Sequence, residues 1–530
     1  MKLITILLFI CSATANAENF KVKSILTENN LQIPISIESL SRVTEETVLR
    51  DLPLFFEGEI HSKERYVEKI VSSEKLSFLE SGLLRSDLLV DNLIEGMEIR
   101  TLKLSGPASN RINLPIVAEG YTLEEKENFF TDANRIYSDL FKHEAFSSFL
   151  NLFNVYAIFV PSNESGVSDF ERKDTAFGSY RRPAGSKRGI MPGDTRYLER
   201  VLKKAPGDDY PILLVNDDYY GGLGGRYAVT TRSLNSGSMV LRHELGHNFG
   251  NVGEEYDGGY VYQGANFDSS SRNIKWSHWL AEDLEVYGTK ILKGAYVWKN
   301  LNGGSHSSSF TFNNPRGDQS LYMLISSVGW ETPDDVKAFV NGQPLELKGV
   351  FTKDRSFFKA RFDGLNSGSY QLKFVDNNKD GDNVLAFARI YSIPKNINTD
   401  KFHIAAYPVH DVNNSKRGFR PTFDTCLMRD MRSDTLCRPD KENMWVRFLN
   451  KVDLIDGVTT GDSKIQVQAP QVEGLSIELK NLSTGEVVVN NSGSFENLSP
   501  GSYKVSVQLT TPEVRKPSTR FTRTRNVTLN

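Results

Sequence analysis

A pair of histidines one helical turn apart most constrains how this chain folds. Residues 239–256 read MVLRHELGHNFGNVGEEY, and His243 and His247 stand four positions apart within them. On an α-helix such positions lie on one face, so both imidazoles can bind a single metal ion. Apolar residues at helical spacing flank the pair, which predicts that this helix packs into a core. Gly250 follows His247 by three residues, and we expect the helix to end there.

The residue between the histidines adds a chemical function to the pair. Glu244 lies next to His243, where its carboxylate can deprotonate a water molecule that a metal ion activates. Histidine accounts for only 8 of the 530 residues, so chance produces this five-residue pattern on the order of once in a hundred such chains. The motif predicts a zinc hydrolase rather than a surface helix with two solvated histidines. Glu254 and Glu255 follow, and each is a candidate for the third metal ligand.

The residues after the second histidine distinguish between classes of zinc peptidase. In metzincin peptidases a third histidine lies six positions after the second, and this chain has Gly253 there. The sequence instead resembles the IgA-metallopeptidase family, whose His-Glu-x-x-His-x-x-Gly motif is followed by an acidic pair and a tyrosine. The matching residues are His243, Glu244, His247, Gly250, Glu254, Glu255 and Tyr256. By this resemblance Glu254 is the expected third ligand. Glu255 stays an alternative, because the family more often has Asp-Glu-Tyr here.

The resemblance extends over residues 100–456 with one long interruption. Other segments similar to the family occur in order at residues 114–122, 162–166, 174–180, 214–222, 426–429 and 445–456. The resemblance implies a secreted zinc metalloendopeptidase that hydrolyses peptide bonds in proteins, with one Zn²⁺ per chain and Glu244 as general base. Tyr256 is a candidate hydrogen-bond donor, although packing beside the ligands is favoured for it. Met428 is a candidate for the apolar floor under the metal in metzincin-like enzymes, or a buried methionine without that role.

The N-terminus has the three parts of an export signal. Lys2 is followed by an apolar run at residues 3–10 and by Ala15-Asn16-Ala17, so we expect a signal peptide over residues 1–17. The run is shorter than the about 20 residues that span a bilayer. The net charge of −3 provides no basic surface for nucleic acid. We therefore expect a secreted or periplasmic monomer that acts on protein or peptide substrates, without nucleic-acid partners and without a membrane anchor after signal removal.

Two cysteines remain after signal removal. An even pair in an exported chain predicts a disulfide, here between Cys426 and Cys437, which would close a small loop around Met428. Two buried free thiols are the alternative. A zinc site built on the two cysteines is less favoured, because the sequence contains no matching second pair.

Composition and periodicity predict several domains. Strand-like and helix-like segments alternate between residues 112 and 216, which indicates a mixed α/β catalytic domain. An internal repeat marks two further modules, because five residues recur at identical spacing. They are Phe362, Leu365, Gly368, Ser369 and Tyr370, repeated as Phe495, Leu498, Gly501, Ser502 and Tyr503. Two sandwich-type β modules that share one corner would explain the repeat, and convergent turn chemistry is the alternative.

The expected fold class is therefore a multidomain combination of α/β and all-β parts. A signal peptide at residues 1–17 precedes an N-terminal β-rich domain at 18–105. A metzincin-like zinc peptidase domain occupies 106–294 and 401–456, with a β-sandwich module inserted at 295–400. An Ig-like β-sandwich at 457–530 closes the chain. Within the catalytic domain, the glycine-rich residues 219–226 are expected beside an edge strand that pairs with extended substrate.

Two weaker interpretations complete the sequence predictions. Residues 376–382, DNNKDGD, have the oxygen spacing of a calcium loop, but Phe387 stands where an EF-hand needs glutamate. A polar β-turn is favoured there over Ca²⁺ binding. For the whole protein, the alternatives are a secreted binding or adhesion protein with a non-catalytic zinc site, and a zinc hydrolase of amidated cell-wall peptides.

Overall fold

The computed structural model describes residues 96–530, except 170, 182–187, 260 and 517, and the backbone of four earlier strands. Those strands are β1 (Asn19–Leu26), β2 (Gln32–Leu40), β3 (Thr47–Asp51) and β4 (Arg65–Ser72). They form an antiparallel sheet of order β2-β1-β4-β3. The predicted signal peptide lies outside the described residues. Among the helices that the structure describes, none is long and apolar enough to cross a membrane.

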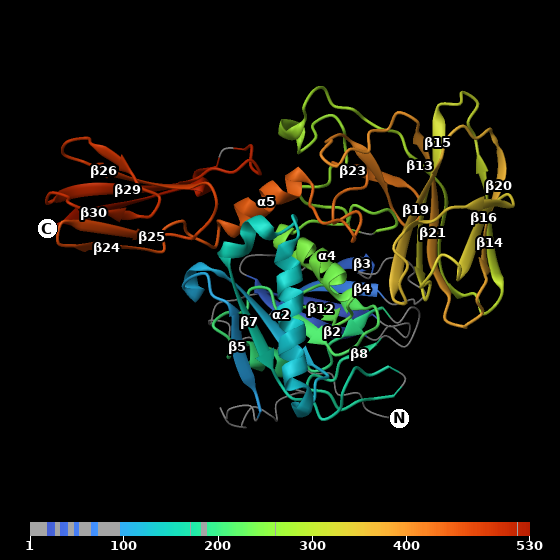
Figure 1. Ribbon diagram of the computed structural model, residues 1–530, viewed down its shortest axis with the longest axis horizontal. Coiled ribbons are helices and arrows are strands. Elements are labelled where there is room, and N and C mark those ends of the chain that lie inside the picture. Colours follow the sequence, from blue (N-terminus) through green and yellow to red (C-terminus); the bar gives the residue numbers. More distant parts are fainter. Residues whose placement is uncertain are drawn as a thin grey trace.

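A six-stranded mixed sheet of order β11-β12-β10-β6-β7-β5 lies at the centre of the molecule (Figure 1). Its strands are β5 (Glu98–Lys103), β6 (Ile112–Glu119), β7 (Phe153–Phe159), β10 (Ile212–Val215), β11 (Gly222–Leu223) and β12 (Ala228–Thr231). The four inner strands are parallel, and β5 and β11 run antiparallel at the two edges. Strand β5 lies within the range predicted for the N-terminal domain, but it pairs with β7 in this sheet.

Helices cover both faces of the central sheet, as the alternating sequence pattern predicts. Helices α2 (Lys126–Lys142) and α4 (Gly237–Gly250) pack on one face, and α3 (Thr195–Leu202) packs on the other. Successive strand residues point to opposite faces. Leu114 and Ile116 therefore join the core under α2 and α4, whereas Val117 joins the core under α3. Helix α5 (Arg438–Phe448) packs against α4 through Phe448, whose ring centroid lies 5.4 Å from that of Phe249.

The connections around the sheet contain short elements. They are η1 (Ala108–Asn110), η2 (Leu123–Glu125), η3 (Ser147–Leu152), η4 (Ser277–Trp279), β8 (Tyr180–Arg181), β9 (Ile190–Met191), β22 (Tyr407–His410) and β23 (Lys416–Arg420). The two pairs β8–β9 and β22–β23 form separate two-stranded sheets. Strands β22 and β23 return the chain from the inserted module to the catalytic core.

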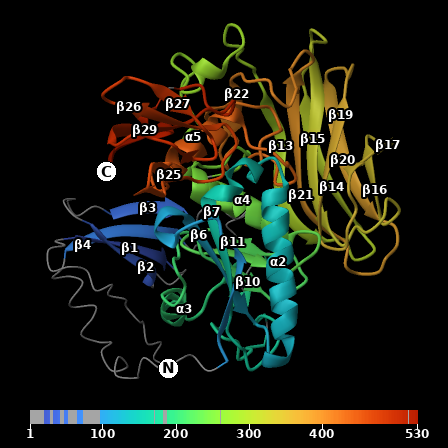
Figure 2. The ribbon, with the colours of Figure 1, turned by 60° about the vertical axis from the view of Figure 1, so that its left-hand side comes forward.

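Two sheets that share one core form the module inserted after the metal-motif helix (Figure 1, Figure 2). Their orders are β13-β21-β15-β19-β18 and β14-β20-β16-β17. The strands are β13 (Lys290–Asn300), β14 (Ser305–Phe312), β15 (Gln319–Val328), β16 (Val336–Val340), β17 (Gln343–Leu345), β18 (Lys348–Gly349), β19 (Arg355–Phe362), β20 (Gly368–Asp376) and β21 (Val384–Pro394). Phe358 of one sheet and Phe374 of the other both pack on Trp330, so the sheets lie face to face.

The C-terminal residues form a second, smaller pair of sheets on the other side of the molecule (Figure 1). Their orders are β24-β25-β28 and β27-β26-β29-β30. The elements are β24 (Gly457–Gly461), β25 (Lys464–Gln468), β26 (Leu475–Asn481), β27 (Val487–Val489), β28 (Ser494–Phe495), β29 (Gly501–Leu509), η5 (Thr519–Phe521) and β30 (Thr522–Leu529). Their core is continuous with that of α4 and α5.

The internal repeat forms the same corner in both modules. Phe362 ends β19 in one sheet and Tyr370 lies in β20 of the other, so the repeat crosses between sheets. Phe495 in β28 and Tyr503 in β29 do the same in the C-terminal module. Each tyrosine hydroxyl donates to the carbonyl oxygen four residues earlier, at Asn366 and at Ser499, both at 2.7 Å. This bond explains why the tyrosine recurs at this position.

Candidate metal centre

The two histidines of the motif face each other on a buried turn of α4. Their Nε2 atoms lie 3.3 Å apart, and the side chains are 3% and 7% exposed. The Nδ1 atom of His243 lies 3.1 Å from the carbonyl oxygen of Leu427, and that of His247 lies 2.9 Å from the carbonyl oxygen of Val252. A carbonyl only accepts, so each Nδ1 carries a ring proton, and the neutral form of each ring has its lone pair at Nε2.

Glu254 completes a group of three metal-binding side chains. Its Oε1 lies 3.0 Å from Nε2 of His247, and its Oε2 lies 3.3 Å from Nε2 of His243. Zinc bound tetrahedrally at about 2.0–2.1 Å from nitrogen and oxygen separates its ligand atoms by about 3.3 Å. The measured spacing of these side chains therefore fits a zinc ion held between them.

The chain reverses direction after α4 without the third histidine of the metzincin pattern. The helix ends at Gly250 as predicted, but the left-handed residue is Asn251, with φ 49°. Gly253 then donates its amide proton to the carbonyl of Gln263. A Cβ atom at Gly253 would lie 2.4 Å from the carbonyl oxygen of Val261. A histidine therefore has no room at this position, and the neighbouring Glu254 lies beside the imidazoles instead.

Glu255, the alternative third ligand, points away from the histidines. Its amide donates to the carbonyl of Met428, and its Oε1 accepts from the thiol of Cys437 at 3.6 Å. Consecutive residues of an extended chain point to opposite sides, so the two glutamates enter different environments. The structure thus brings Glu254, and not Glu255, to the histidines.

Opposite charges compensate for burial within the group of three. Burial alone lowers the pKa of His243, but the carboxylates of Glu254 and Glu244 raise it to about 9. Burial raises the pKa of Glu254, but the imidazoles of His247 and His243 lower it to about 2. Glu254 is therefore ionised at neutral pH. Glu244 lies on the same buried turn of α4 and is 2% exposed.

Met428 lies directly beneath α4. A Cβ atom at Gly246 would approach its Sδ atom to 2.6 Å, so the helix rests on this side chain at a glycine. The preceding carbonyl, of Leu427, is the acceptor for His243. Tyr256 stacks beside His243, with ring centroids 6.1 Å apart and planes inclined by 26°. Both candidates therefore lie next to the histidines, Met428 under the helix and Tyr256 beside a ring.

The predicted disulfide is absent from the structure, in which the buried Cys426 and Cys437 are free thiols. The reason is that acceptors from other segments engage both sulfur atoms. The thiol of Cys426 donates to Asp440 at 3.5 Å, and that of Cys437 donates to Glu255 at 3.6 Å. The backbone amide of Cys437 donates to the sulfur of Cys426 at 3.2 Å. The alternative of two buried thiols describes the structure better.

A buried network that the sequence did not indicate holds the segment after Tyr256. The carboxylate of Asp257 accepts from Arg429 at 2.7 Å, from Tyr391 at 2.8 Å and from the backbone amide of His410 at 2.7 Å. Tyr391 belongs to the inserted module and Arg429 to the loop under α4. Asp257 therefore ties the inserted module to the candidate metal centre. Its position directly after Tyr256, at the end of the metal motif, was the available signal.

The DNNKDGD loop is closed by its own hydrogen bonds. Asp376 accepts from the amide of Lys379 at 3.1 Å and from the amide of Gly303 at 2.6 Å. The side chain of Asn383 donates to Asp376 at 3.2 Å and to Asn378 at 2.6 Å. These contacts are those of the polar turn that the sequence favours.

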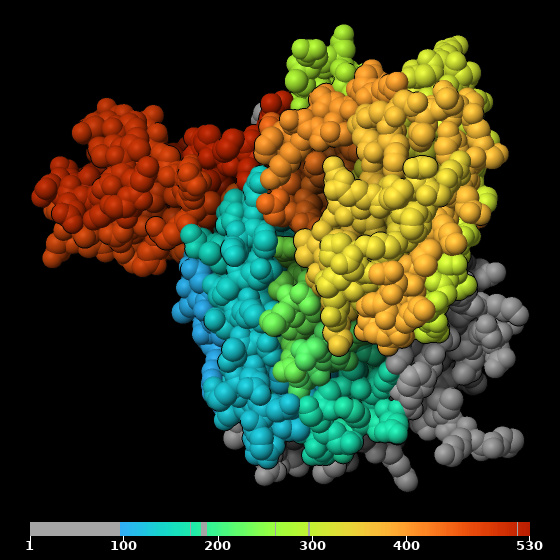
Figure 3. Space-filling view, turned by 45° about the vertical axis from the view of Figure 1, so that its right-hand side comes forward, coloured from blue at the N-terminus to red at the C-terminus, as the bar shows by residue number. Residues whose placement is uncertain are grey.

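The glycine-rich residues 219–226 contain the edge strand β11, which lies beside α4. A Cβ atom at Gly222 would approach Cγ1 of Val240 on that helix to 2.5 Å, so only glycine lets the strand come this close. Strand β11 lies at the edge of the six-stranded sheet, and on its outer side Gly189 forms a β-bridge with Gly222, whose amide donates to the carbonyl of Arg188 at 2.9 Å. Figure 3 shows green catalytic segments at the surface between α2, in cyan, and the inserted module, in yellow.

Comparison with known proteins agrees with the motif. Residues 100–284 match the family model described as IgA Peptidase M64, which confirms the predicted resemblance. No curated protein matches the chain. A lipase from Bacillus licheniformis in propeptide form matches at 10% identity, over 82% of this chain and 96% of that chain, with a TM-score of 0.19. A β-glucuronidase from Ruminococcus gnavus matches at 10% identity, over 42% and 35%, with a TM-score of 0.11. Such low TM-scores support no conclusion.

Proposed function

Residues 100–284 match the IgA Peptidase M64 family model, and from this match we propose that the protein is a secreted zinc metalloendopeptidase. Its substrates are proteins or peptides. The observation that supports the proposal most directly is the convergence of His243, His247 and Glu254 at zinc-ligand spacing. The finer fold assignment belongs to the same proposal: a metzincin-like catalytic domain with Met428 as its floor, an Ig-like C-terminal module, and export through residues 1–17.

The proposed mechanism assigns a role to each side chain. Zinc, when bound, supplies Lewis acidity toward a peptide carbonyl and lowers the pKa of a water molecule. His243 and His247 hold it through Nε2, and the carbonyls of Leu427 and Val252 fix the orientation of the rings. Glu244 accepts the proton of the attacking water and delivers it to the leaving amine.

Chelation and one substitution test this proposal. A chelator should abolish cleavage of an unfolded protein substrate, and added zinc should restore it. The Glu244→Gln variant should keep its zinc and lose about 10²–10⁴-fold in kcat, because it lacks the general base. The Glu254→Gln variant should instead lose zinc from this site, measured by elemental analysis of the purified protein.

The opposite outcome identifies the alternative function. Cleavage of the unfolded protein by the Glu244→Gln variant at the wild-type rate would show that Glu244 is not the general base. A zinc-loaded wild-type protein that cleaves no unfolded protein or peptide would favour a binding or adhesion protein with a non-catalytic zinc site.

A further inference from the structure

A second cluster of metal-binding side chains lies directly behind the first. Glu255, Cys426, Cys437 and Asp440 place one ligand atom each within 4.8 Å of one another, and all four side chains are buried. Glu255 follows Glu254 in the chain, so one peptide unit separates the two clusters. The sequence did not suggest this group, because a pair of cysteines alone lacks the four donors of a zinc site.

The spacing within the second cluster matches a tetrahedral ion. The sulfur of Cys426 lies 3.5 Å from Oδ2 of Asp440, and that of Cys437 lies 3.6 Å from Oε1 of Glu255. Zinc bonds of about 2.3 Å to sulfur and about 2.1 Å to oxygen separate such donors by about 3.6 Å at the tetrahedral angle. Both sulfur–oxygen distances therefore match the separation of two ligand atoms around a tetrahedral zinc ion.

In the described part of the chain, two carboxylate oxygens of the cluster lack a hydrogen-bond partner, and a cation would provide one. Four acidic groups meet there, and among the described residues the Oε2 atom of Glu255 and the Oδ1 atom of Asp440 have no hydrogen-bond partner. A buried carboxylate oxygen without a partner is costly.

The basic residue that acts electrostatically on Glu255 donates its hydrogen bonds to other acceptors. Arg420 acts on Glu255 electrostatically, but its guanidinium donates to the carbonyls of Pro408 and Phe423. Within the described residues, no ion pair joins a basic side chain to Glu255 or Asp440. A bound cation would therefore supply the charge that the surrounding side chains do not.

We propose that Glu255, Cys426, Cys437 and Asp440 bind a second zinc ion, in a closed structural site. Thiolates select zinc over calcium or magnesium, and four protein ligands leave no position open for a substrate. The ion would join the acidic pair to the loop under α4 and to the first turn of α5, where Cys437 is the N-cap. That loop contributes Leu427, the acceptor for His243, so the second ion would steady the first site. This proposal does not depend on peptidase activity.

Metal counting on the purified full chain tests the proposal. The wild-type protein should contain about two zinc ions per chain, and the His243→Ala/His247→Ala variant about one. Asp440→Asn in that double variant should remove the remaining zinc. Asp434→Asn is the matched control, because Asp434 lies on the same loop with its side chain 57% exposed, and it should keep the remaining zinc. A double variant without zinc, or one in which Asp440→Asn changes nothing, would overturn the proposal.

Spectroscopy and thiol titration identify the ligands and exclude a disulfide. Cobalt bound to the His243→Ala/His247→Ala variant should show thiolate-to-metal charge-transfer absorption, which the first site cannot produce because it has no sulfur ligand. The thiols should resist a thiol reagent until a chelator is added. Thiols that stay unreactive with chelator and appear only after reduction would establish a disulfide instead. Thiols that react at once without chelator would also contradict the proposal.

Discussion

The two consecutive glutamates after α4 contact different partners. Glu254 lies beside the imidazoles, and Glu255 accepts from the thiol of Cys437. The backbone amides of Glu254 and Glu255 donate to the carbonyls of Val261 and Met428 respectively, which fixes the orientation of this segment. The backbone hydrogen bonds of this segment therefore hold two identical glutamate side chains beside different partners, one beside the imidazoles and one beside a thiol.

The contact between Gly246 and Met428 provides a residue-scale prediction. The Gly246→Ala substitution adds a methyl group 2.6 Å from Sδ of Met428, and overpacking of this kind costs about 1–3 kcal/mol of unfolding free energy. The same substitution at Gly288, which has open space around it, should change stability by less than about 0.5 kcal/mol. Thermal unfolding of the two variants measures the difference. Equal stability would show that the helix does not rest on Met428.

At the scale of elements, the start of helix α2 illustrates how local sequence and tertiary contacts combine. The amide of Thr122 donates to Glu125, which completes a capping box at η2, the short helix that leads directly into α2. The same carboxylate accepts from Ser165 at 2.9 Å and from Asn216 at 3.0 Å. Glu125 thus caps the helix and binds two loops at the carboxyl ends of β7 and β10.

This carboxylate makes stability depend on pH. Burial alone raises the pKa of Glu125, but hydrogen bonds from Thr122, Ser165 and Asn216 lower it below its usual value. The stabilisation is therefore present above the unfolded pKa of about 4.3 and is lost as pH falls through the lower folded pKa. Glu125→Gln should cost about 1 kcal/mol at pH 7, and the difference from wild type should vanish at about pH 3.

Denaturant unfolding of the wild type and of this variant across pH measures the effect. Glu124→Gln is the matched control, because Glu124 is the exposed neighbour of Glu125 and should have little influence at any pH. A difference that persists unchanged at low pH would show that the charge of Glu125 contributes nothing.

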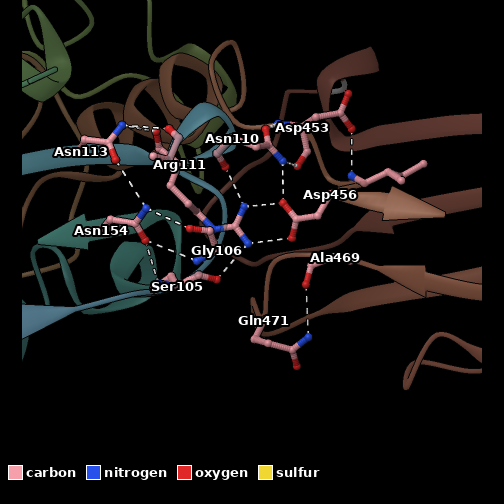
Figure 4. A network of polar contacts seen from close by, with 12 residues as sticks. Ser105, Gly106, Asn110, Arg111, Asn113, Asn154, Asp453, Asp456, Ala469 and Gln471 are labelled. Carbon is pink, nitrogen blue, oxygen red and sulfur yellow. Dashed lines mark hydrogen bonds and ion pairs between the residues drawn. The ribbon is translucent and has the colours of Figure 1, made fainter. Parts of the chain in front are cut away.

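At the scale of the whole molecule, one buried ion pair joins the catalytic region to the C-terminal module (Figure 4). The guanidinium of Arg111, 1% exposed, donates to both oxygens of Asp456, at 2.6 and 2.7 Å. Asn110 adds a bond to Asp456 at 2.7 Å, and Arg111 also donates to the carbonyl of Ser105. The pair links the residue that precedes β6 to the residue that precedes β24.

Breaking this pair should loosen the junction. Asp456→Asn removes the charge that compensates the buried Arg111, and the loss of one partner of such a pair costs about 3–5 kcal/mol. Glu496→Gln breaks the exposed pair with Lys464 in the same module and should change stability far less, because solvent screens an exposed pair. Scanning calorimetry measures both variants, and limited proteolysis near residue 456 should accelerate only in the first. Identical behaviour of the two would remove the proposed role of the junction.

The sequence pattern alone predicted the features that depend on residues close together in the chain. The pairing of His243 and His247 on one helix, and the alternation of strands and helices between residues 112 and 216, follow from periodicity, which depends on a few adjacent side chains. The repeat that ends at Tyr370 and Tyr503 was visible for the same reason, since each hydroxyl bonds four residues away.

Folding alone decides the contacts between residues distant in the chain. Cys426 and Cys437 suggested a disulfide when they were counted as a pair, but acceptors at Asp440 and at Glu255, far upstream of both, engage them in space. Arg111 and Asp456 meet across 345 positions. Such contacts depend on how whole sheets and helices pack together, and no local periodicity records that packing.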